Sequence, residues 1–335
     1  MSKLVTPQFK IALLHPRYWL TWMSFGLWMT VSQLPYPLLL VLGKLFGWII
    51  YTFARRRRAI VQRNIELCFP DKMVMEQERL VRQHLLDLGI GIFETGIAWF
   101  APKQRLQNRI HIEGLDTIQT LLDANEGILF LVPHFTALEI LGVAVNQRID
   151  NLDQTYRPHN NSVYDWIQSR ARKRHNPSCT VLAARDVRGI VRSLKEGRRI
   201  SFLPDQDYGR KHSVFAPFFG VPAATVTSMA RLAQLAKVKV IPLMCWRTAE
   251  NTYRVKVFPA LAQFPSGDDV RDASHVNHAV EDCIHICPEQ YLWSHRRFKT
   301  RPEGEEDLYQ IPESRTKQRR RERKRQQRRK AAPTN

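Results

Sequence analysis

Residues 127–133 read Gly-Ile-Leu-Phe-Leu-Val-Pro and run directly into His134-Phe-Thr-Ala-Leu-Glu139. The first stretch is an apolar run of strand length, which is typical of a strand buried on both faces of a sheet. The second puts a histidine at the carboxyl end of that strand, where open α/β sheets place their ligands. This junction predicts an α/β fold and marks the place to look for chemistry.

The rest of the chain repeats the alternation. Residues 199–204 and 238–246 are further strand-length apolar runs, and residues 253–259 alternate in polarity like an antiparallel neighbour. Residues 221–227 read as a loop leading into a packed helix. Helices are expected at 59–100, 139–146, 163–175, 187–196 and 227–237. Together these elements predict a layered mixed sheet flanked by helices.

Composition bounds the class of protein. The 335 residues contain 51 Lys and Arg against 31 Asp and Glu, a formal charge of +20, and 44% are hydrophobic, which excludes wholesale disorder. Five cysteines are too few and odd in number for a disulfide-stapled secreted domain. Residues 315–330 carry half of the charge excess. Such a chain should bind anionic partners, among them phospholipid headgroups, phosphorylated glycolipids, nucleic acid or an acidic carrier protein.

The N-terminal region predicts a membrane anchor. Residues 18–43 contain no charged side chain, and a bilayer core needs about 20 apolar residues in a helix. Pro35 and Pro37 predict a kink or two half-length segments. The arginines at 55–58 place the rest of the chain in the cytoplasm by the positive-inside rule. A buried helical hairpin of a soluble domain is the alternative.

The expected organisation is therefore a tail at 1–17, a membrane anchor at 18–54, a catalytic domain at 55–304 and a basic tail at 305–335.

His134 and Glu139 suggest a general base. Five residues span 500° on a regular helix, so the histidine must lie in the turn before the helix for the carboxylate to reach back to it. A carboxylate on Nδ1 leaves Nε2 free to accept a proton and stabilises the resulting imidazolium. The nucleophile would then be a substrate hydroxyl. The same spacing also fits a structural polar pair.

Three other patterns have plain alternatives. Asp205-Gln-Asp207 resembles the metal-binding motif of nucleotide-sugar transferases, but no glycine-rich phosphate loop accompanies it. Residues 283–287 read Cys-Ile-His-Ile-Cys, which fits a helical face better than a zinc site. Residues 215–219, Phe-Ala-Pro-Phe-Phe, could line an acyl groove or pack in the core. No metal site is expected.

A histidine and a glutamate five residues apart after an apolar strand resemble the glycerolipid-type acyltransferases, and further blocks resemble one branch, the late acyltransferases of lipid A biosynthesis, especially the lauroyl- and palmitoleoyl-transferases. The similarity runs from about residue 14 to residue 304. Its ordered blocks lie at residues 14–22, 33–37, 64–70, 94–100, 156–161, 204–211, 215–219, 289–293 and 295–304.

The resemblance implies a reaction. Members take an acyl chain from a thioester on acyl carrier protein and place it on the hydroxyl of a hydroxyacyl chain of a Kdo-bearing lipid A precursor. The product is an acyloxyacyl ester. The resemblance implies no cofactor, a single-pass anchor and a catalytic domain on the cytoplasmic face of the bacterial inner membrane, in contact with phospholipid.

The resemblance also extends the site. Arg172 and Asp205 match its active-site set, beside His134 and Glu139. The matched blocks supply candidates for substrate binding, in particular for phosphates and Kdo carboxylates: Arg157, Asp207, Arg296, Arg297, Lys299 and Arg301. The acyl chain length stays open, as do two rival functions: acylation of a simpler lysophospholipid, and nucleic-acid binding through the arginine tail, although no nucleic-acid-binding fold is recognisable.

Overall fold

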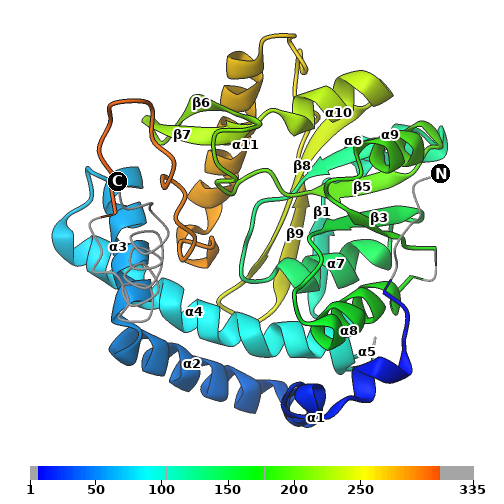
Figure 1. Cartoon of the computed structure of the whole chain (residues 1–335), viewed down its shortest axis with the longest axis vertical. Helices are drawn as coiled ribbons and strands as arrows, with labels where there is room; N and C mark the ends of the chain where they lie inside the picture. The colour runs from blue at the N-terminus through cyan, green and yellow to red at the C-terminus, as the bar shows by residue number, and fades with distance from the viewer. Residues whose placement is uncertain (1–6, 103, 177, 310–335) are drawn as a thin grey trace, which may run out of the picture.

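The computed structural model describes residues 7–102, 104–176 and 178–309. Its centre is a seven-stranded sheet in the order β1-β9-β8-β2-β5-β3-β4, and β6 and β7 form a separate hairpin (Figure 1). Helices pack on both faces of the large sheet, so the expected mixed α/β architecture is confirmed. The arginine-rich residues 310–335, most of the expected basic tail, lie outside the described residues.

The large sheet is parallel apart from one antiparallel pair, β8 with β9. The three strands predicted from apolar runs are confirmed as β2, β8 and β5, and the predicted antiparallel neighbour is β9. The short strands β1, β3 and β4 were not predicted. The bounds are β1 (Ile110–Glu113), β2 (Ile128–Leu131), β3 (Leu152–Tyr156), β4 (Val181–Ala183), β5 (Arg199–Phe202), β8 (Lys239–Arg247) and β9 (Tyr253–Val257).

Every predicted helical region is helical, with a break in the longest one at residues 69–73. The helices are α1 (Trp19–Val31), α2 (Tyr36–Phe53), α3 (Arg55–Cys68), α4 (Val74–Phe100), α5 (Gln104–Gln107), α6 (Asp116–Asp123), α7 (Leu138–Asn146), α8 (Ser162–Lys173), α9 (Val187–Lys195), α10 (Ser228–Ala236) and α11 (Asp269–Ile286). Three short 3-10 helices complete the set: η1 (Ile11–Leu14), η2 (Pro16–Tyr18) and η3 (Pro288–Gln290).

Strand β2 shows why its sequence is apolar throughout. Ile128 and Phe130 pack into the core that includes α6, α7 and α8, whereas Leu129 and Leu131 pack into the core that includes α9, α10 and α11. All four side chains are fully buried. A strand covered on both faces has no position that can carry a polar side chain without a partner.

The loop predicted at 221–227 is wrong, because Val221–Val226 is strand β7. It pairs antiparallel with β6 (Ser213–Phe218) across a two-residue turn at Phe219 and Gly220, both with positive φ. Such turns match the twist of paired strands and favour glycine. Phe218 is fully buried beside the rings of Tyr291 and Phe298, so core packing is the role of this aromatic residue.

A buried ionic cluster fixes α4 to the sheet. Arg247 of β8 pairs with Asp87 and with Glu94, whose Oε1 lies 2.9 Å from the arginine Nε. The hydroxyl of Tyr253 in β9 donates to the same Glu94 oxygen at 2.8 Å. Separation of α4 from the sheet would leave these buried charges without partners. The free-energy cost of that separation is therefore high.

The predicted anchor at 18–54 forms two helices, α1 and α2, as one of the two sequence interpretations expected. With 13 residues, α1 is about 20 Å long and too short to cross a bilayer core. Within the described part of the chain, α2 is the one helix long and apolar enough for a crossing. It packs on α4 at backbone contact, since a Cβ on Gly89 would lie 2.3 Å from the carbonyl oxygen of Gly43.

Candidate active site

Two neighbouring strands bring His134 and Asp205 together. In the parallel pair of β2 and β5, residue 128 lies opposite residue 199 and residue 131 opposite residue 202. Each chain then continues for three residues, so the same register sets His134 beside Asp205. The Asp205 Oδ1 lies 2.6 Å from His134 Nδ1, and its Oδ2 accepts the backbone N–H of His134 at 2.8 Å. The carboxylate is 1% exposed and the imidazole 18%.

The expected contact between Glu139 and His134 is wrong. Asp205 occupies the Nδ1 position, and Glu139 instead accepts hydrogen bonds from the Arg172 guanidinium, the shortest at 2.5 Å, and from the Trp99 indole at 2.9 Å. The physical reason is that α7 begins at Leu138, so Glu139 already lies on the first helical turn. From there its side chain points to α8 and α4 and not back over the turn.

Both carboxylates are buried yet ionised. Burial opposes ionisation of Asp205, but the charge of His134 and the hydrogen bonds from its ring and backbone lower the pKa of the carboxyl below its ordinary value. Burial likewise opposes ionisation of Glu139, and the Arg172 charge with the bonds from Arg172 and Trp99 lowers the pKa of that carboxyl. The site therefore holds two carboxylates: one orients the histidine, and one joins helices α4, α7 and α8.

A third segment closes the site beside His134. The Leu292 N–H donates to the His134 carbonyl oxygen at 2.8 Å, and Phe135 forms an isolated antiparallel bridge with Tyr291. Burial and the adjacent Asp205 carboxylate raise the pKa of Tyr291 well above its ordinary value, so the phenol stays protonated and faces the carboxylate as a donor. Tyr291 was not predicted as a site residue, although it lies within one of the blocks that carry the resemblance.

His295 is a second residue that the sequence did not single out. It lines a small pocket together with His134, Asp205 and Tyr291. Its Nε2 accepts the backbone N–H of Asp207 at 3.1 Å, and burial lowers the pKa of its imidazole to about 4. His295 is therefore neutral near pH 7, and it holds the loop after β5 in place.

Arg157, another residue expected to bind substrate, lies at the carboxyl edge of the sheet. It directly follows β3, the sheet neighbour of β5, and its side chain is exposed. Burial and the Asp205 charge raise the pKa of Tyr208, and the positive charge of Arg157 opposes that rise. Arg157 and Asp205 therefore both act on this tyrosine. Arg157 thus stands at the carboxyl edge of the sheet, on the loop side that carries Asp205.

Arg297 and Asp207, which were also expected to bind substrate, are buried and make hydrogen bonds within the protein, and Arg297 lines the pocket beside His134. Arg297 is 2% exposed, and its guanidinium donates to the Ala224 carbonyl oxygen at 2.7 Å and to Thr225 Oγ1 at 2.8 Å. Asp207 is buried and accepts from the Thr300 N–H and hydroxyl at 2.6 and 2.8 Å. Protein donors occupy both Asp207 oxygens, whereas the Arg297 Nε has no hydrogen-bond partner among the described residues.

The remaining basic candidates are spread along the C-terminal segment. Arg296 pairs with Asp307 and lies over the ring of Tyr309. Arg301 donates to the Pro222 carbonyl oxygen and pairs with Glu305. Lys299 is half exposed, with its Nζ 3.7 Å from Asp207 Oδ1. Lys299 is thus the freest of these three to meet an anionic ligand.

Metal-ligating residues do not converge. Across residues 7–102, 104–176 and 178–309, no group of three or more His, Cys, Asp or Glu side chains could hold a metal ion. Cys283 and Cys287 are buried, whereas His285 is exposed between them in the chain. Asp205 faces His134 while Asp207 faces Thr300, so the two carboxylates of that motif do not share a site.

A histidine held by a buried carboxylate at the edge of a small pocket is the arrangement typical of a general base in an enzyme. The family model described as bacterial lipid A biosynthesis acyltransferase matches residues 6–300. The chain belongs to this family, and the protein is an acyltransferase.

Three individual proteins of one organism show the same similarity. The chain is 42% identical over 308 residues to the lipid A biosynthesis palmitoleoyltransferase of Escherichia coli (strain K12), covering 90% of this chain and 99% of the relative. It is 39% identical over 305 residues to the lauroyltransferase of the same organism, with the same coverage, and 29% identical over 318 residues to its myristoyltransferase, covering 91% and 96%.

Proposed function

We propose that this acyltransferase moves a fatty acyl chain from acyl carrier protein to the hydroxyl of a hydroxyacyl chain on a Kdo-bearing lipid A precursor, Kdo2-lipid IVA. The product is an acyloxyacyl ester. The relatives' names, which specify lipid A biosynthesis and three different acyl groups, support the acceptor class and leave the chain length open. The reaction needs no cofactor besides the carrier-bound thioester.

The observation that carries this proposal is the His134–Asp205 pair. With Nδ1 directed at the Asp205 carboxylate, the remaining ring nitrogen Nε2 is the proton acceptor. It removes the proton of the acceptor hydroxyl as the oxygen attacks the thioester carbonyl carbon. The C–S bond then breaks, and the imidazolium returns the proton to the departing thiolate of the carrier.

Asp205 and Arg172 have distinct duties in this scheme. Asp205 fixes the tautomer of the imidazole and stabilises the imidazolium that forms. Arg172 neutralises Glu139 and holds the start of α7, one helical turn beyond the His134 turn. Arg157 and Lys299, which project from the carboxyl edge and the C-terminal segment, are assigned to the phosphates or Kdo carboxylates of the acceptor.

We place the enzyme at the cytoplasmic face of the inner membrane, where acyl carrier protein and the lipid precursor meet. The basic balance of the chain, +20 overall, suits both the acidic carrier and anionic phospholipid.

The test is direct. The purified full chain is incubated with a mixed pool of acyl carrier thioesters and either Kdo2-lipid IVA or a lysophospholipid, and the products are identified by mass spectrometry. Acylation of the lipid A precursor, lost in His134→Ala, is the expected result. Acylation of the lysophospholipid alone would overturn the assignment of the acceptor.

A further inference from the structure

The exposed apolar side chains of the molecule are concentrated at one end of the chain. Of the twenty-four large apolar side chains that are exposed in the described residues, fifteen lie between residues 9 and 53. Those on α1 and α2 are Trp19, Leu20, Met23, Leu27, Met29, Leu38, Val41, Leu45, Phe46, Trp48, Ile49 and Phe53. An exposed apolar area of this extent marks an interaction site. These exposed faces of α1 and α2 are termed the base surface.

Helix α2 has two apolar faces. One face, which includes Leu39, Gly43 and Gly47, is buried, and the glycines pack on α4. The other, which includes Val41 and Leu45, faces away from the domain. Only the first face is covered by other described residues of this chain. The second face therefore needs an apolar partner outside the chain.

Both ends of α2 are fastened to the same domain. At its start, the Tyr36 hydroxyl lies 2.7 Å from the hydroxyl of Tyr253 in the sheet, and Arg105 donates to the carbonyl oxygen of Ser32 at 2.6 Å. Just past its end, Arg57 donates to the Ser294 carbonyl oxygen at 2.9 Å. A helix that crossed a bilayer would have these two ends on opposite sides of it.

Helix α4, on which α2 packs, could not enter a bilayer together with α2. It carries six acidic or arginine side chains along its length, including the Asp87 and Glu94 that are bound to the sheet. A charged side chain at a bilayer centre is costly, and here the whole sheet would have to be carried with it. The geometry therefore opposes a crossing by α2.

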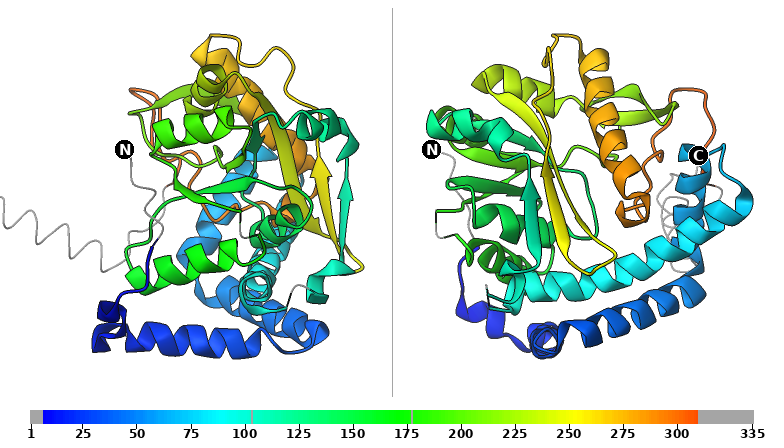
Figure 2. Two further views of the ribbon diagram at one scale, coloured as in Figure 1. Left: turned by 90° about the vertical axis from the view of Figure 1, so that its right-hand side faces the viewer. Right: turned by 180° about the vertical axis from the view of Figure 1, so that it is seen from behind.

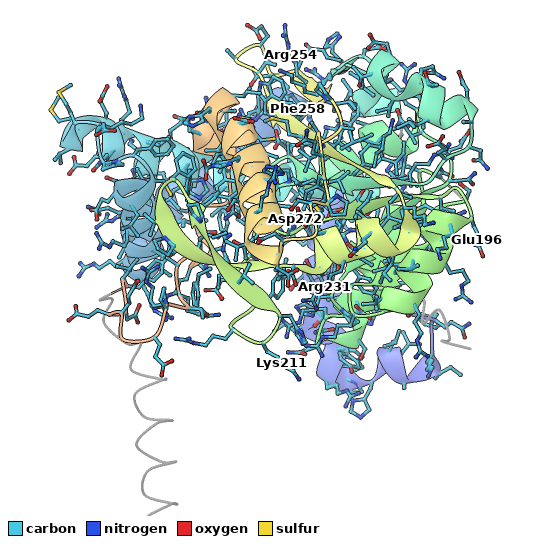
Figure 3. All side chains as sticks on the ribbon, turned by 90° about the horizontal axis from the view of Figure 1, so that it is seen from above. Glu196, Lys211, Arg231, Arg254, Phe258 and Asp272 are labelled. Carbon is cyan, nitrogen blue, oxygen red and sulfur yellow. The ribbon has the colours of Figure 1, made fainter. Side chains whose placement is uncertain are left out.

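The figures show the arrangement that remains. Helices α1 and α2 lie together along the base of the molecule, and α1 is seen almost end-on in the view that shows α2 lengthwise (Figures 1 and 2). Two helices that run in different directions at one level form a platform. The opposite face, seen from above, carries charged side chains such as Arg231, Arg254 and Glu196 (Figure 3).

The charged residues around the base surface indicate which kind of partner it binds. The first 65 residues contain nine Lys and Arg and no Asp or Glu. Arg55 and Arg56 are exposed directly after α2, and Lys44 is exposed on α2 itself. Apolar side chains bordered by cations fit a lipid surface with anionic headgroups.

We propose that the base surface binds an anionic phospholipid bilayer from one side, with α1 and α2 lying in the plane of the interface and no segment of residues 7–53 crossing it. The acceptor's own lipid nature is consistent with this surface but does not carry the argument. The single crossing expected from the sequence is the alternative, and the two arrangements put residue 10 on different sides of the membrane.

Cysteine labelling separates them. All five native cysteines are buried, which gives a low background. Lys10→Cys and Arg56→Cys are expressed separately in the full chain and treated with a membrane-impermeant maleimide, in intact spheroplasts and in inverted membrane vesicles. The proposal requires both positions to be labelled from the same side, whereas labelling from opposite sides would overturn it.

A binding measurement tests the surface independently of topology and of catalysis. Leu45 and Leu235 are 52% and 54% exposed, on α2 and on the distant α10. Leu45→Asp should lower partitioning of the purified chain onto phosphatidylglycerol vesicles at least about tenfold. Leu235→Asp, the matched control, should change it less than twofold. Val41→Asp repeats the test one turn away, and equal partitioning by all the variants would refute the proposal.

Discussion

Replacement of Asp205 by asparagine isolates the role of the buried carboxylate. The side chain keeps its shape, but only one of its two terminal atoms can still accept a hydrogen bond. In the unsubstituted protein the His134 backbone N–H donates to Oδ2 at 2.8 Å, so the remaining amide oxygen of the asparagine would accept this hydrogen bond. The amide NH2 would then face Nδ1 and donate to it, so the ring proton would move to Nε2. The histidine would present a proton where the mechanism needs a base.

The expected size of the effect follows from two losses. A hydrogen bond to a charged group, such as the 2.6 Å contact to the imidazolium, contributes about 1.5–3 kcal/mol, which is about ten- to a hundredfold in rate. Loss of the correct tautomer removes general-base catalysis, which is worth about 10²–10⁴-fold. The two losses overlap, so we expect kcat to fall by about 10²–10⁴-fold.

The assay is initial acyl transfer from the carrier thioester to the lipid A precursor, with circular dichroism to confirm the fold. Asp207→Asn is the matched control, because Asp207 is also a buried carboxylate that accepts backbone N–H groups but contacts Thr300 in place of His134. It should lower the free energy of unfolding and leave kcat of the folded enzyme within about tenfold. An Asp205→Asn enzyme with nearly normal turnover would show that the carboxylate does not set the state of the imidazole.

Three further perturbations test the scaffold. Glu139→Ala should lower the free energy of unfolding by about 3–5 kcal/mol, since it leaves Arg172 buried and unpaired, and the double variant with Arg172→Ala should be less destabilised than the sum of the single variants in a denaturant titration. Gly89→Ala should loosen α2 and expose it to limited proteolysis, whereas Gly26→Ala, at a helical glycine with no atom within 4 Å of the new Cβ, should be neutral or stabilising by up to about 1 kcal/mol. Burial lowers the pKa of His84 to about 4, so the unfolded chain binds more protons between pH 6.5 and 4 and stability should fall by up to about 3 kcal/mol as the pH drops through that range; His84→Gln should flatten this part of the measured stability profile, and an unchanged profile would contradict the assignment.

The central strands could be predicted because burial on both faces leaves a direct trace in the sequence. The apolar run that ends at Pro133 and the runs at 199–204 and 238–246 are the inner strands of the sheet. Strand β3 leaves no such trace, since it contains Asp153, Gln154 and Thr155, whose burial depends on partners from elsewhere. The Asp153 carboxylate, for example, accepts the Thr180 N–H and pairs with Arg198.

The sequence singled out His134, Glu139 and Asp205, but it paired His134 with the wrong carboxylate. Spacing along the chain suggested Glu139 as the partner of His134, because a contact five residues away is visible in a sequence. The true partner lies 71 residues away, and it follows from the register of β2 and β5, which only the sheet order reveals. Had the two strands been known to be neighbours, equal offsets from residues 131 and 202 would have pointed to Asp205.

Helix α4 joins the base of the molecule to its chemistry. One side of it packs on α2, while its last turn places the Trp99 indole on the Glu139 carboxylate. Phe25 and Trp28 of α1 pack on the same indole ring. If the base surface rests on lipid, these contacts fix the height of His134 above the bilayer. An acceptor hydroxyl that sits on an acyl chain near the headgroups has a defined height too, so a rigid base would align the two without drawing the lipid fully out of the membrane.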